Sequence, residues 1–578
     1  MGDLDRFFSP ASVAVIGASH GTEKIGGRAL RTLLKHGYRG RVYPINPNHS
    51  EVAGLKSFKS ISEVPDAVDL AIIAIPAALV PDVVDDCADA GVKAAVILSS
   101  GFAETGAAGA ELEERLRTTC QRTGIRLSGP NAEGFFNVGG CTAATFNGSI
   151  DPDSGDTSSA AQIAVVSQSG GLAFAFFNKG RRDDLIFSHV VSVGNQADLE
   201  TADYVAHLIE QDAIRVVLMY VESFRNPSRF LTAARRAADL GKPIVMARIG
   251  NSAAGSRAAR SHTGAMASPK AVVDAVMDAA GIVQADDHDE LLNIAGAFLG
   301  NPLPQGKRVG IVSISGGTAA WLADACSAGG LEVPELDAAT QARIARCIPP
   351  YGTSNNPVDV TAQADGYLEP LEIVGKAKNI DAVILAANFA GDRRLVREGQ
   401  AIADWVRRVG KPVLIYSYAS PGEKSRQLMR ELGLHCFTSL QGCVRSLRSL
   451  VQYAEYQRTR GERQAPGRRR EDVPEAAARL LADPRKTLCE YEAKLLLAAY
   501  GVPIPEEALA RGVEEAVAHA ERLGFPVALK VQSPDIPHKT EARAVQLHLS
   551  SAAGVREAYA IVIENAKRYA RNADIHGV

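Results

Sequence analysis

A histidine in a loop of small residues is the position at which this sequence is best suited to group-transfer chemistry. His262 stands in the run Ser-His-Thr-Gly at 261–264 and closes a loop of glycine, alanine and serine that follows the strand-like run 243–249. Small neighbours leave room for a group the size of a phosphate, and imidazole is nucleophilic near neutral pH. The alternative is a turn histidine that bonds to local backbone.

A carboxylate at the end of an apolar run is a candidate partner for this histidine. Glu222 directly follows the apolar run 216–221. A carboxylate that holds one ring nitrogen of a histidine makes the other nitrogen more nucleophilic. Taken alone, Glu222 is more simply interpreted as a solvated strand end.

A serine- and glycine-rich turn before a helix forms a candidate anion site. Ser169, Gly170 and Gly171 follow the apolar run 163–166 and precede an apolar helix that begins near Leu172. Backbone N–H groups and the positive end of a helix favour a bound phosphate there. The same pattern recurs at 315–317, either as a second anion site or as a structural relic.

A first glycine loop, residues 17–27, also exposes backbone donors at the start of a helix. No acidic residue ends the next strand, where the ribose partner of NAD would stand, and Asn46 and Pro47 occur instead. This disfavours a dehydrogenase and favours another nucleotide such as coenzyme A, although the loop could serve only to pack strand against helix. We expect the crevice to be lined by Gly17, Ser19, Lys24, Asn46, Pro47, Ser100, Gly101 and Asn131.

These loops need an α/β scaffold to position them. The first buried parallel strand is predicted to begin at residue 12 and to end at the loop that starts at 17. Further buried strands are predicted over 41–47, 70–75 and 94–98, with a helix over 27–36. The strand-loop pattern restarts near 160 and near 307 with the shared motif Val-Ser-x-Ser-Gly-Gly, which indicates a duplicated domain. The predicted domains are 1–145, 155–300, 305–455 and 486–578, with a polar, arginine-rich linker over 456–485.

Composition excludes several classes of protein. With 578 residues, 46% hydrophobic content and a net charge of -3, the sequence gives no reason to expect a nucleic-acid or membrane partner. The eight cysteines lack a Cys-x-x-Cys pair, so no metal site is expected, and a reduced cytoplasm is the default location. The amino terminus lacks the features of a signal peptide, and no apolar run reaches the length of a membrane span.

The motifs occur in an order that resembles the nucleoside-diphosphate-forming acyl-CoA synthetases, relatives of succinyl-CoA synthetase. The resemblance rests on the turns at 17–19, 129–131 and 167–171, on Glu222 and His262, and on Ser-Pro-Asp-Ile-Pro-His-Lys at 533–539. It implies a Rossmann-like CoA-binding domain, two flavodoxin-like ligase domains and the start of an ATP-grasp domain. It also implies an acid-thiol ligase that uses ATP, releases ADP and phosphate, and passes through an acyl phosphate.

The same resemblance implies roles for individual residues. His262 would carry the phosphoryl group, Glu222 would orient it, and the turn 169–171 would hold its phosphate. His538 would be a second phosphorylated histidine, unless it is a plain loop histidine, and Lys530 would contact the nucleotide phosphates. Coenzyme A, ATP or ADP, and Mg²⁺ are the implied cofactors, and a small carboxylic acid is the implied substrate.

Two departures from the family pattern bear on the nucleotide site. Arg543 occurs where the family continues with paired glycines, and the sequence stops before the later ATP-grasp strands. We therefore expect an incomplete ATP site, with a homodimer or a complementing ATP-grasp subunit as candidate partners. The alternatives are a regulatory protein that binds CoA or acyl-CoA, and an acyltransferase relative without ligase turnover.

Overall fold

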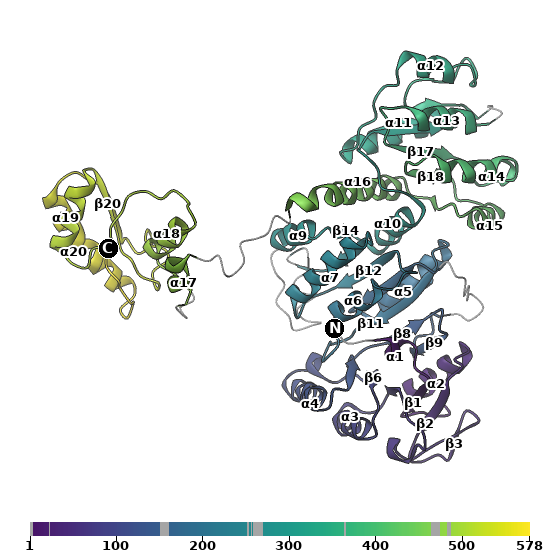
Figure 1. Ribbon diagram of the computed structural model, residues 1–578, viewed down its shortest axis with the longest axis horizontal. Helices are drawn as coiled ribbons and strands as arrows, with labels where there is room; N and C mark the ends of the chain where they lie inside the picture. The colour runs from purple at the N-terminus through teal and green to yellow at the C-terminus, as the bar shows by residue number, and fades with distance from the viewer. Residues whose placement is uncertain are drawn as a thin grey trace. The chain divides into compact units, whose positions relative to one another are not determined.

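The chain forms two compact units, residues 1–460 and 461–578 (Figure 1). The computed structural model describes residues 4–21, 23–150, 161–250, 252, 254–255, 257, 270–362, 366–463, 474–482 and 487–578. Within these ranges no helix is both long enough and apolar enough to cross a membrane.

The first sheet of the larger unit is wholly parallel, with strand order β2-β1-β5-β6-β7. Its strands are β1 (Ser12–Ile16), β2 (Arg41–Ile45), β5 (Leu70–Ile73), β6 (Ala94–Ile97) and β7 (Arg126–Ser128), and its helices are α2 (Ile25–Lys35), α3 (Val80–Asp89) and α4 (Ala107–Thr123). The central strands are buried on both faces, as continuous apolar runs between helices must be. A short hairpin, β3 (Glu51–Val52) and β4 (Leu55–Lys56), follows β2.

The second sheet has seven strands in the order β14-β13-β12-β10-β11-β8-β9. Its parallel strands are β10 (Ile163–Ser167), β11 (Phe187–Ser192), β12 (Val216–Val221), β13 (Ile244–Arg248) and β14 (Val283–Ala285). Its helices are α5 (Gly170–Arg182), α6 (Thr201–Leu208), α7 (Pro227–Asp239), α9 (Lys270–Ala279) and α10 (His288–Gly300).

An antiparallel edge of this second sheet comes from residues that the sequence analysis assigns to the first domain. Strand β8 (Gly134–Asn137) pairs antiparallel with β11 and with β9 (Thr142–Thr145). Near the amino terminus, α1 (Asp5–Phe8) buries Phe7 and Phe8 against Phe135 of β8. The second sheet therefore begins at Gly134, upstream of the expected boundary at 145.

The third sheet is parallel, with strand order β16-β15-β17-β18-β19. Its strands are β15 (Val309–Ser313), β16 (Val358–Asp359), β17 (Ala382–Ala387), β18 (Val413–Ser417) and β19 (Cys436–Phe437). Its helices are α11 (Gly316–Ala328), α12 (Ala338–Ile344), α13 (Leu368–Lys376), α14 (Arg393–Arg408), α15 (Glu423–Leu432) and α16 (Leu440–Arg463). Helix α16 continues into the predicted linker, because its Arg, Glu and Gln residues are good helix formers.

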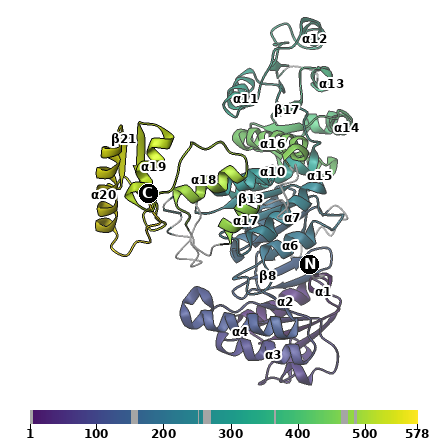
Figure 2. The same ribbon diagram turned by 60° about the vertical axis from the view of Figure 1, so that its left-hand side comes forward.

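The smaller unit is built from helices and one two-stranded antiparallel sheet. Its elements are α17 (Glu475–Leu481), α18 (Glu490–Ala499), α19 (Val513–Leu523), β20 (Val527–Lys530), β21 (Val545–Leu549) and α20 (Ala552–Tyr569). Helices α19 and α20 pack side by side (Figure 2) and share an apolar core with β20. The parallel sheets of the larger unit, together with these elements, confirm the α/β class expected from the sequence.

Candidate functional site

The glycine loop at the carboxyl end of β1 is shaped by close contacts that side chains would block. Gly17 has a φ of 89°, and a Cβ atom placed on it would lie 2.4 Å from the carbonyl oxygen of Ala74. A Cβ atom on Gly26, in the first turn of α2, would lie 2.2 Å from the carbonyl oxygen of Gly17. The loop can therefore fold back onto the start of α2 only with glycine at these positions.

The neighbouring turns bring most of the predicted crevice residues to the same edge of the sheet. The side-chain amide of Asn46 donates to the carbonyl oxygen of Ala18 at 2.6 Å and so ties the end of β2 to the glycine loop. Gly101, with a φ of 108°, donates its N–H to Glu104 Oε1 at 2.6 Å. Ser19 is half-buried, whereas Lys24, Pro47 and Ser100 are exposed.

The loop at 129–134 joins this edge to the second sheet. Asn131 adopts a left-handed conformation with a φ of 57°, and its N–H donates to the carbonyl oxygen of Ser99 at 2.9 Å. Its side-chain amide donates to Asn195 Oδ1 at 3.3 Å, and the N–H of Asn195 donates to the carbonyl oxygen of Pro130 at 2.8 Å. The crevice of the first sheet and the loop after β11 are thereby held together.

Glu133, in the same loop, extends its carboxylate to the start of α5. A Cβ atom placed on Gly170 would lie 2.4 Å from Glu133 Cγ and 3.0 Å from Glu133 Oε1. The N–H of Glu133 donates to Ser192 Oγ at 2.9 Å, and Asn147 donates to its carboxylate. The sequence analysis missed Glu133, although it stands in the turn singled out for Asn131, because nothing in the local pattern indicates its distant partner.

The start of α5 is not capped by the side chain of its N-cap residue. Ser169 is the N-cap residue, but its side chain makes no capping hydrogen bond, and the Ser167 hydroxyl donates to the Ser169 carbonyl at 2.6 Å. In the duplicate, Ser315 caps α11 by accepting from the N–H of Thr318 at 3.4 Å. Of the two duplicated turns, the one at α5 is therefore better suited to a bound anion.

Glu222 lies beside this turn because β10 and β12 are neighbours in the sheet. Gln168 accepts hydrogen bonds from the N–H groups of Glu222 and Ser223, at 2.5 and 3.0 Å, and donates to the carbonyl oxygen of Ser223. Glu222 is half-buried. The burial of Tyr220 and the nearby charge of Glu222 together raise the pKa of Tyr220 to about 12. His262 and the rest of the run 261–264 lie outside the described residues.

A separate cluster of charges occupies the smaller unit. Glu490 accepts from Lys530 at 3.0 Å and pairs with Lys494 at 2.9 Å and Lys539 at 3.3 Å. Burial opposes ionisation, but the hydrogen bonds from Lys494 and Lys530 outweigh it and hold the pKa of Glu490 at about 2. The sequence analysis singled out Lys530 and missed Glu490 and Lys494, which only the fold brings to it.

Lys494 and Lys530 of this cluster line a cavity that could receive an anionic ligand. Its volume is about 360 Å³, and Glu490, Lys494, Lys530 and His519 contribute to its wall. His538 lies in the loop after β20, where it is exposed, and its carbonyl oxygen accepts from the N–H of Ala542 at 3.1 Å. The cavity and His538 thus belong to the same unit as Lys530.

Four protein-family models match successive parts of the chain. They describe a CoA-binding domain over residues 11–136, a succinyl-CoA ligase-like flavodoxin domain over 160–298, a Ligase-CoA domain over 309–390 and an ATP-grasp domain over 479–578. Their order is the order in which the three sheets and the smaller unit follow one another.

Similar proteins cover nearly the whole chain. The 4-hydroxybutyrate–CoA ligase (ADP-forming) of Nitrosopumilus maritimus is 31% identical over 99% of this chain and 81% of its own length. The α subunit of the acetate–CoA ligase (ADP-forming) II of Pyrococcus furiosus is 34% identical over 78% of this chain and 98% of its own, and the β subunit is 44% identical over 17% and 42%.

A solved structure shares the fold of most of the chain. It is the dinucleotide-forming acetyl-coenzyme A synthetase 1 of Candidatus Korarchaeum cryptofilum in complex with phosphate and ADP. The TM-score is 0.72 at 30% identity, and the match covers 81% of this chain and all of that one.

Proposed function

The chain belongs to the family of ADP-forming acyl-CoA ligases, and from this premise we propose how its residues share the reaction. Enzymes of this class join a carboxylic acid to coenzyme A at the expense of ATP. In our proposal the crevice of the first sheet holds coenzyme A, the start of α5 holds phosphate, and Glu222 orients His262 as the phosphoryl acceptor. The smaller unit holds the nucleotide phosphates.

The loop 129–134 contacts both the crevice of the first sheet and the start of α5, and this observation is the main support for the proposal. Asn131 bonds to the Ser99 turn of the first sheet, and Glu133 reaches Gly170 at the start of α5. A thiol bound at the first crevice and a phosphate bound at the second would therefore meet beside one loop. Such proximity is what the attack of a thiol on an acyl phosphate requires.

The glycine loop fits coenzyme A by its shape. Added Cβ atoms at Gly17, Gly26 and Gly27 would clash with backbone atoms, so only glycine fits there. Because no side chains project from these positions, the backbone N–H groups of the loop can approach a phosphate closely. Lys24 is exposed at the N-cap of α2 and can add a positive charge. Asn46 holds the loop in place, while Pro47, Ser100 and Gly101 border the same edge of the sheet.

The proposed reaction at the first two sites has two chemical steps. In the direction of acyl-CoA cleavage, phosphate attacks the thioester carbon, the carbon–sulfur bond breaks, and acyl phosphate and CoA result. His262 next attacks phosphorus, the bond between phosphorus and the acyl oxygen breaks, and the free carboxylate leaves. Glu222 stabilises the positive charge of the imidazole, and the N–H groups of Gly170 and Gly171 stabilise the charge on the phosphoryl oxygens.

The second phosphoryl transfer would involve residues of the smaller unit. His538 would take the phosphoryl group from His262 and pass it to ADP, whose phosphates Lys530 would contact in exchange for its pairing with Glu490. When bound, Mg²⁺ neutralises charge on the nucleotide phosphates. Among the described residues, both clusters of three candidate ligands include a histidine, whereas Mg²⁺ prefers oxygen ligands, so we assign none of them to it.

A second polypeptide could share this part of the reaction. The ligase II of Pyrococcus furiosus consists of separate α and β subunits, both similar to parts of this chain. We include a complementing ATP-grasp subunit or a homodimer among the candidate partners. Sedimentation with and without ADP would distinguish a homodimer from a monomer.

Phosphate labelling tests the proposal without requiring the nucleotide site. The full chain is incubated with radiolabelled phosphate, Mg²⁺ and a panel of acyl-CoAs, and protein-bound label that is acid-labile and base-stable is measured. We expect label that depends on acyl-CoA, is absent from His262→Ala and is slowed in Glu222→Gln. Absence of label with every acyl-CoA, from a folded protein that binds CoA, would refute the proposal and favour a regulatory CoA-binding protein.

A further inference from the structure

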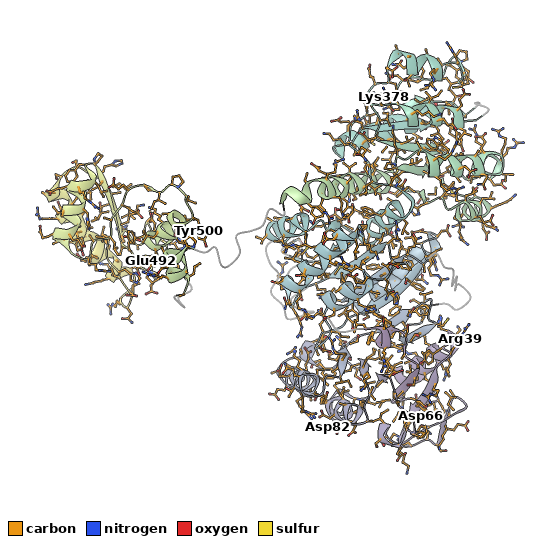
Figure 3. The ribbon with its side chains drawn as sticks, viewed as in Figure 1. Arg39, Asp66, Asp82, Lys378, Glu492 and Tyr500 are labelled. Atoms are coloured by element: carbon orange, nitrogen blue, oxygen red, sulfur yellow. The ribbon has the colours of Figure 1, made fainter. Side chains whose placement is uncertain are left out.

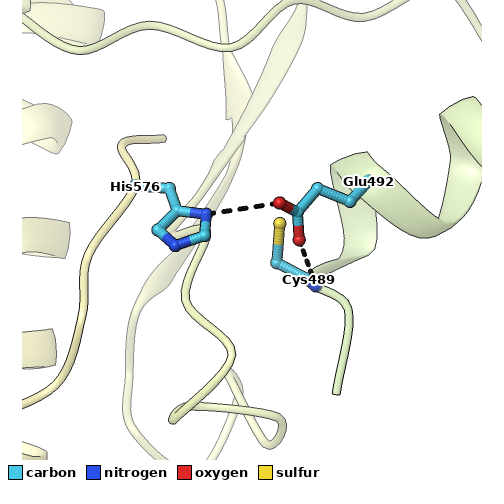
Figure 4. Close-up of side chains that lie close together, drawn as sticks. All are labelled: Cys489, Glu492 and His576. Atoms are coloured by element: carbon cyan, nitrogen blue, oxygen red, sulfur yellow. Dashed lines mark hydrogen bonds and ion pairs between the residues drawn. The ribbon is translucent and has the colours of Figure 1, made fainter. Parts of the chain in front are cut away.

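A cysteine, a glutamate and a histidine from distant parts of the sequence meet in the smaller unit. Cys489 precedes α18, Glu492 (labelled in Figure 3) lies in the first turn of α18, and His576 lies in the segment after α20. Figure 4 shows the three side chains together. One ligand-capable atom of each residue lies within 4.8 Å of those of the other two. These residues take no part in the proposed ligase reaction.

The three side chains form a partly enclosed group. Cys489 is buried, whereas the side chains of Glu492 and His576 are 14% and 20% exposed. Glu492 Oε1 lies 3.7 Å from His576 Nδ1, and the other carboxylate oxygen accepts from the N–H of Cys489 at 3.0 Å. A sulfur, an oxygen and a nitrogen of different side chains thus lie around one small volume.

A second layer of contacts fixes the histidine ring. His576 Nε2 lies 3.0 Å from Asp574 Oδ2, which leaves Nδ1 directed toward Glu492. The N–H of His576 donates to the carbonyl oxygen of Gln532 at 2.9 Å, and the Gln532 side chain accepts from the N–H of Tyr491 beside Cys489. A carboxylate on the remote nitrogen of a histidine is the usual support of a metal-binding histidine.

Helix capping explains only part of this cluster. Cys489 and Glu492 form a capping box at the start of α18, in which each side chain contacts the backbone of the other residue. Serine, threonine, aspartate and asparagine are the residues favoured at such a position, so the cap alone does not require a thiol. The cap also requires neither His576 nor Asp574.

We propose that Cys489, Glu492 and His576 bind a zinc ion, with water as the fourth ligand. Thiolate, imidazole and carboxylate are the ligands that zinc takes, and a set with sulfur disfavours Mg²⁺. Bonds of about 2.0–2.3 Å would hold the ligand atoms roughly 3.3–3.8 Å apart, which small side-chain rotations achieve from the observed arrangement. Binding releases the thiol proton to solvent and links α18 to the segment that contains His576.

Cobalt substitution is the sharpest test, because a cobalt–thiolate bond has its own absorption band in the near ultraviolet. The full chain is stripped with a chelator, titrated with Co²⁺, and then titrated with Zn²⁺. We expect a charge-transfer band at one equivalent that Zn²⁺ abolishes, and a rise in the midpoint of thermal unfolding with Zn²⁺.

Cys489→Ser is the informative variant, because serine retains the helix cap and removes the sulfur ligand. The variant should fold as the wild type does, show no band and gain no thermal stability from Zn²⁺. Cys120→Ser, which changes a half-buried cysteine in the first domain, should retain both effects. His576→Gln should weaken Zn²⁺ binding at least about tenfold, as for loss of a metal ligand or its support.

Two outcomes would overturn the zinc site. The first is a wild-type chain that shows neither the band nor the stabilisation, which would leave the cluster as a capping box with an ion pair. The second is a band that persists in Cys489→Ser, which would assign the metal to another thiol. If Cys489→Ser does not fold, the affinity of His576→Gln for Zn²⁺ becomes the test of the site. An affinity equal to that of the wild type rejects the site.

Discussion

The carboxylate of Glu133 lies against Gly170, the first residue of α5, so close that a Cβ atom on Gly170 would be 2.4 Å from Glu133 Cγ. The start of a helix attracts anions through its free N–H groups and its positive dipole end. A carboxylate of the protein therefore lies beside the position where our proposal puts the phosphate, and its charge opposes the binding of an anion there.

Gly170→Ala tests the proposed phosphate site at this contact. The added methyl group must displace Glu133 or shift the start of α5, and we expect the acyl-CoA-dependent labelling rate to fall about tenfold, equivalent to about 1.4 kcal/mol. Gly171→Ala is the matched control, because its Cβ atom would meet only Glu133 Oε1, at an ordinary 3.8 Å. Equal effects of the two substitutions would argue against this geometry.

Glu133→Gln should make the start of α5 a better phosphate site. The substitution removes a negative charge that competes with phosphate, and charges at helix ends contribute about 0.3–1 kcal/mol. We therefore expect the phosphate concentration for half-maximal labelling to fall about two- to fivefold. Weaker phosphate binding in the variant would instead show that Glu133 assists the ligand directly.

His538→Ala should separate the two phosphoryl transfers. His538 and His262 belong to different units, so the variant should still acquire label from phosphate and acyl-CoA at the wild-type rate. Added ADP and Mg²⁺ should discharge the label from the wild type but not from the variant, as followed by formation of labelled ATP. Discharge at the wild-type rate would make His538 a plain loop histidine.

Glu490→Gln should alter how the stability of the smaller unit depends on pH. The folded pKa of Glu490 is lowered from 4.5 to about 2, so its ion pairs stabilise the fold fully above about pH 5, and this stabilisation is lost as the pH falls toward 2. For a partly exposed network, we expect the variant to be less stable by about 1–2 kcal/mol at pH 7.

Hydrogen exchange of peptides from α18 would measure this effect in the intact chain. The difference between wild type and variant should be constant from pH 7 to pH 5 and should shrink by pH 3. Lys494→Met is a useful comparison, because it removes one of the three lysine partners and leaves the Glu490 carboxylate in place. A difference that is independent of pH down to 3 would contradict the assigned pKa.

The parallel strands were predictable because burial on both faces leaves continuous apolar runs. The runs at 70–75 and 94–98 become β5 and β6 almost as expected, and the α/β class and the ligase family are confirmed. Strands β8 and β9 were not predictable from local pattern, because each has only four residues and because β8 pairs with β11 as well as with β9, and only the fold brings β8 to β11.

The candidate site likewise contains residues that could be placed from the sequence and residues that could not. Glycine turns and Glu222 follow apolar strands, so their common edge could be inferred from periodicity. Glu133 and Glu490 could not, because each acquires its role from a residue that the fold alone brings near it. The roles of His262 and His538 remain predictions from the resemblance.

The arrangement at the two duplicated turns has a consequence for turnover. Asp359 lies near Gly316, where an added Cβ atom would be 2.8 Å from Asp359 Oδ2, much as Glu133 lies near Gly170. Each helix start thus has a carboxylate beside its first glycine. We expect a phosphoryl group bound at the start of α5 to be released readily, because the nearby Glu133 carboxylate repels it, and ready release is what the transfer of the group to a second acceptor requires.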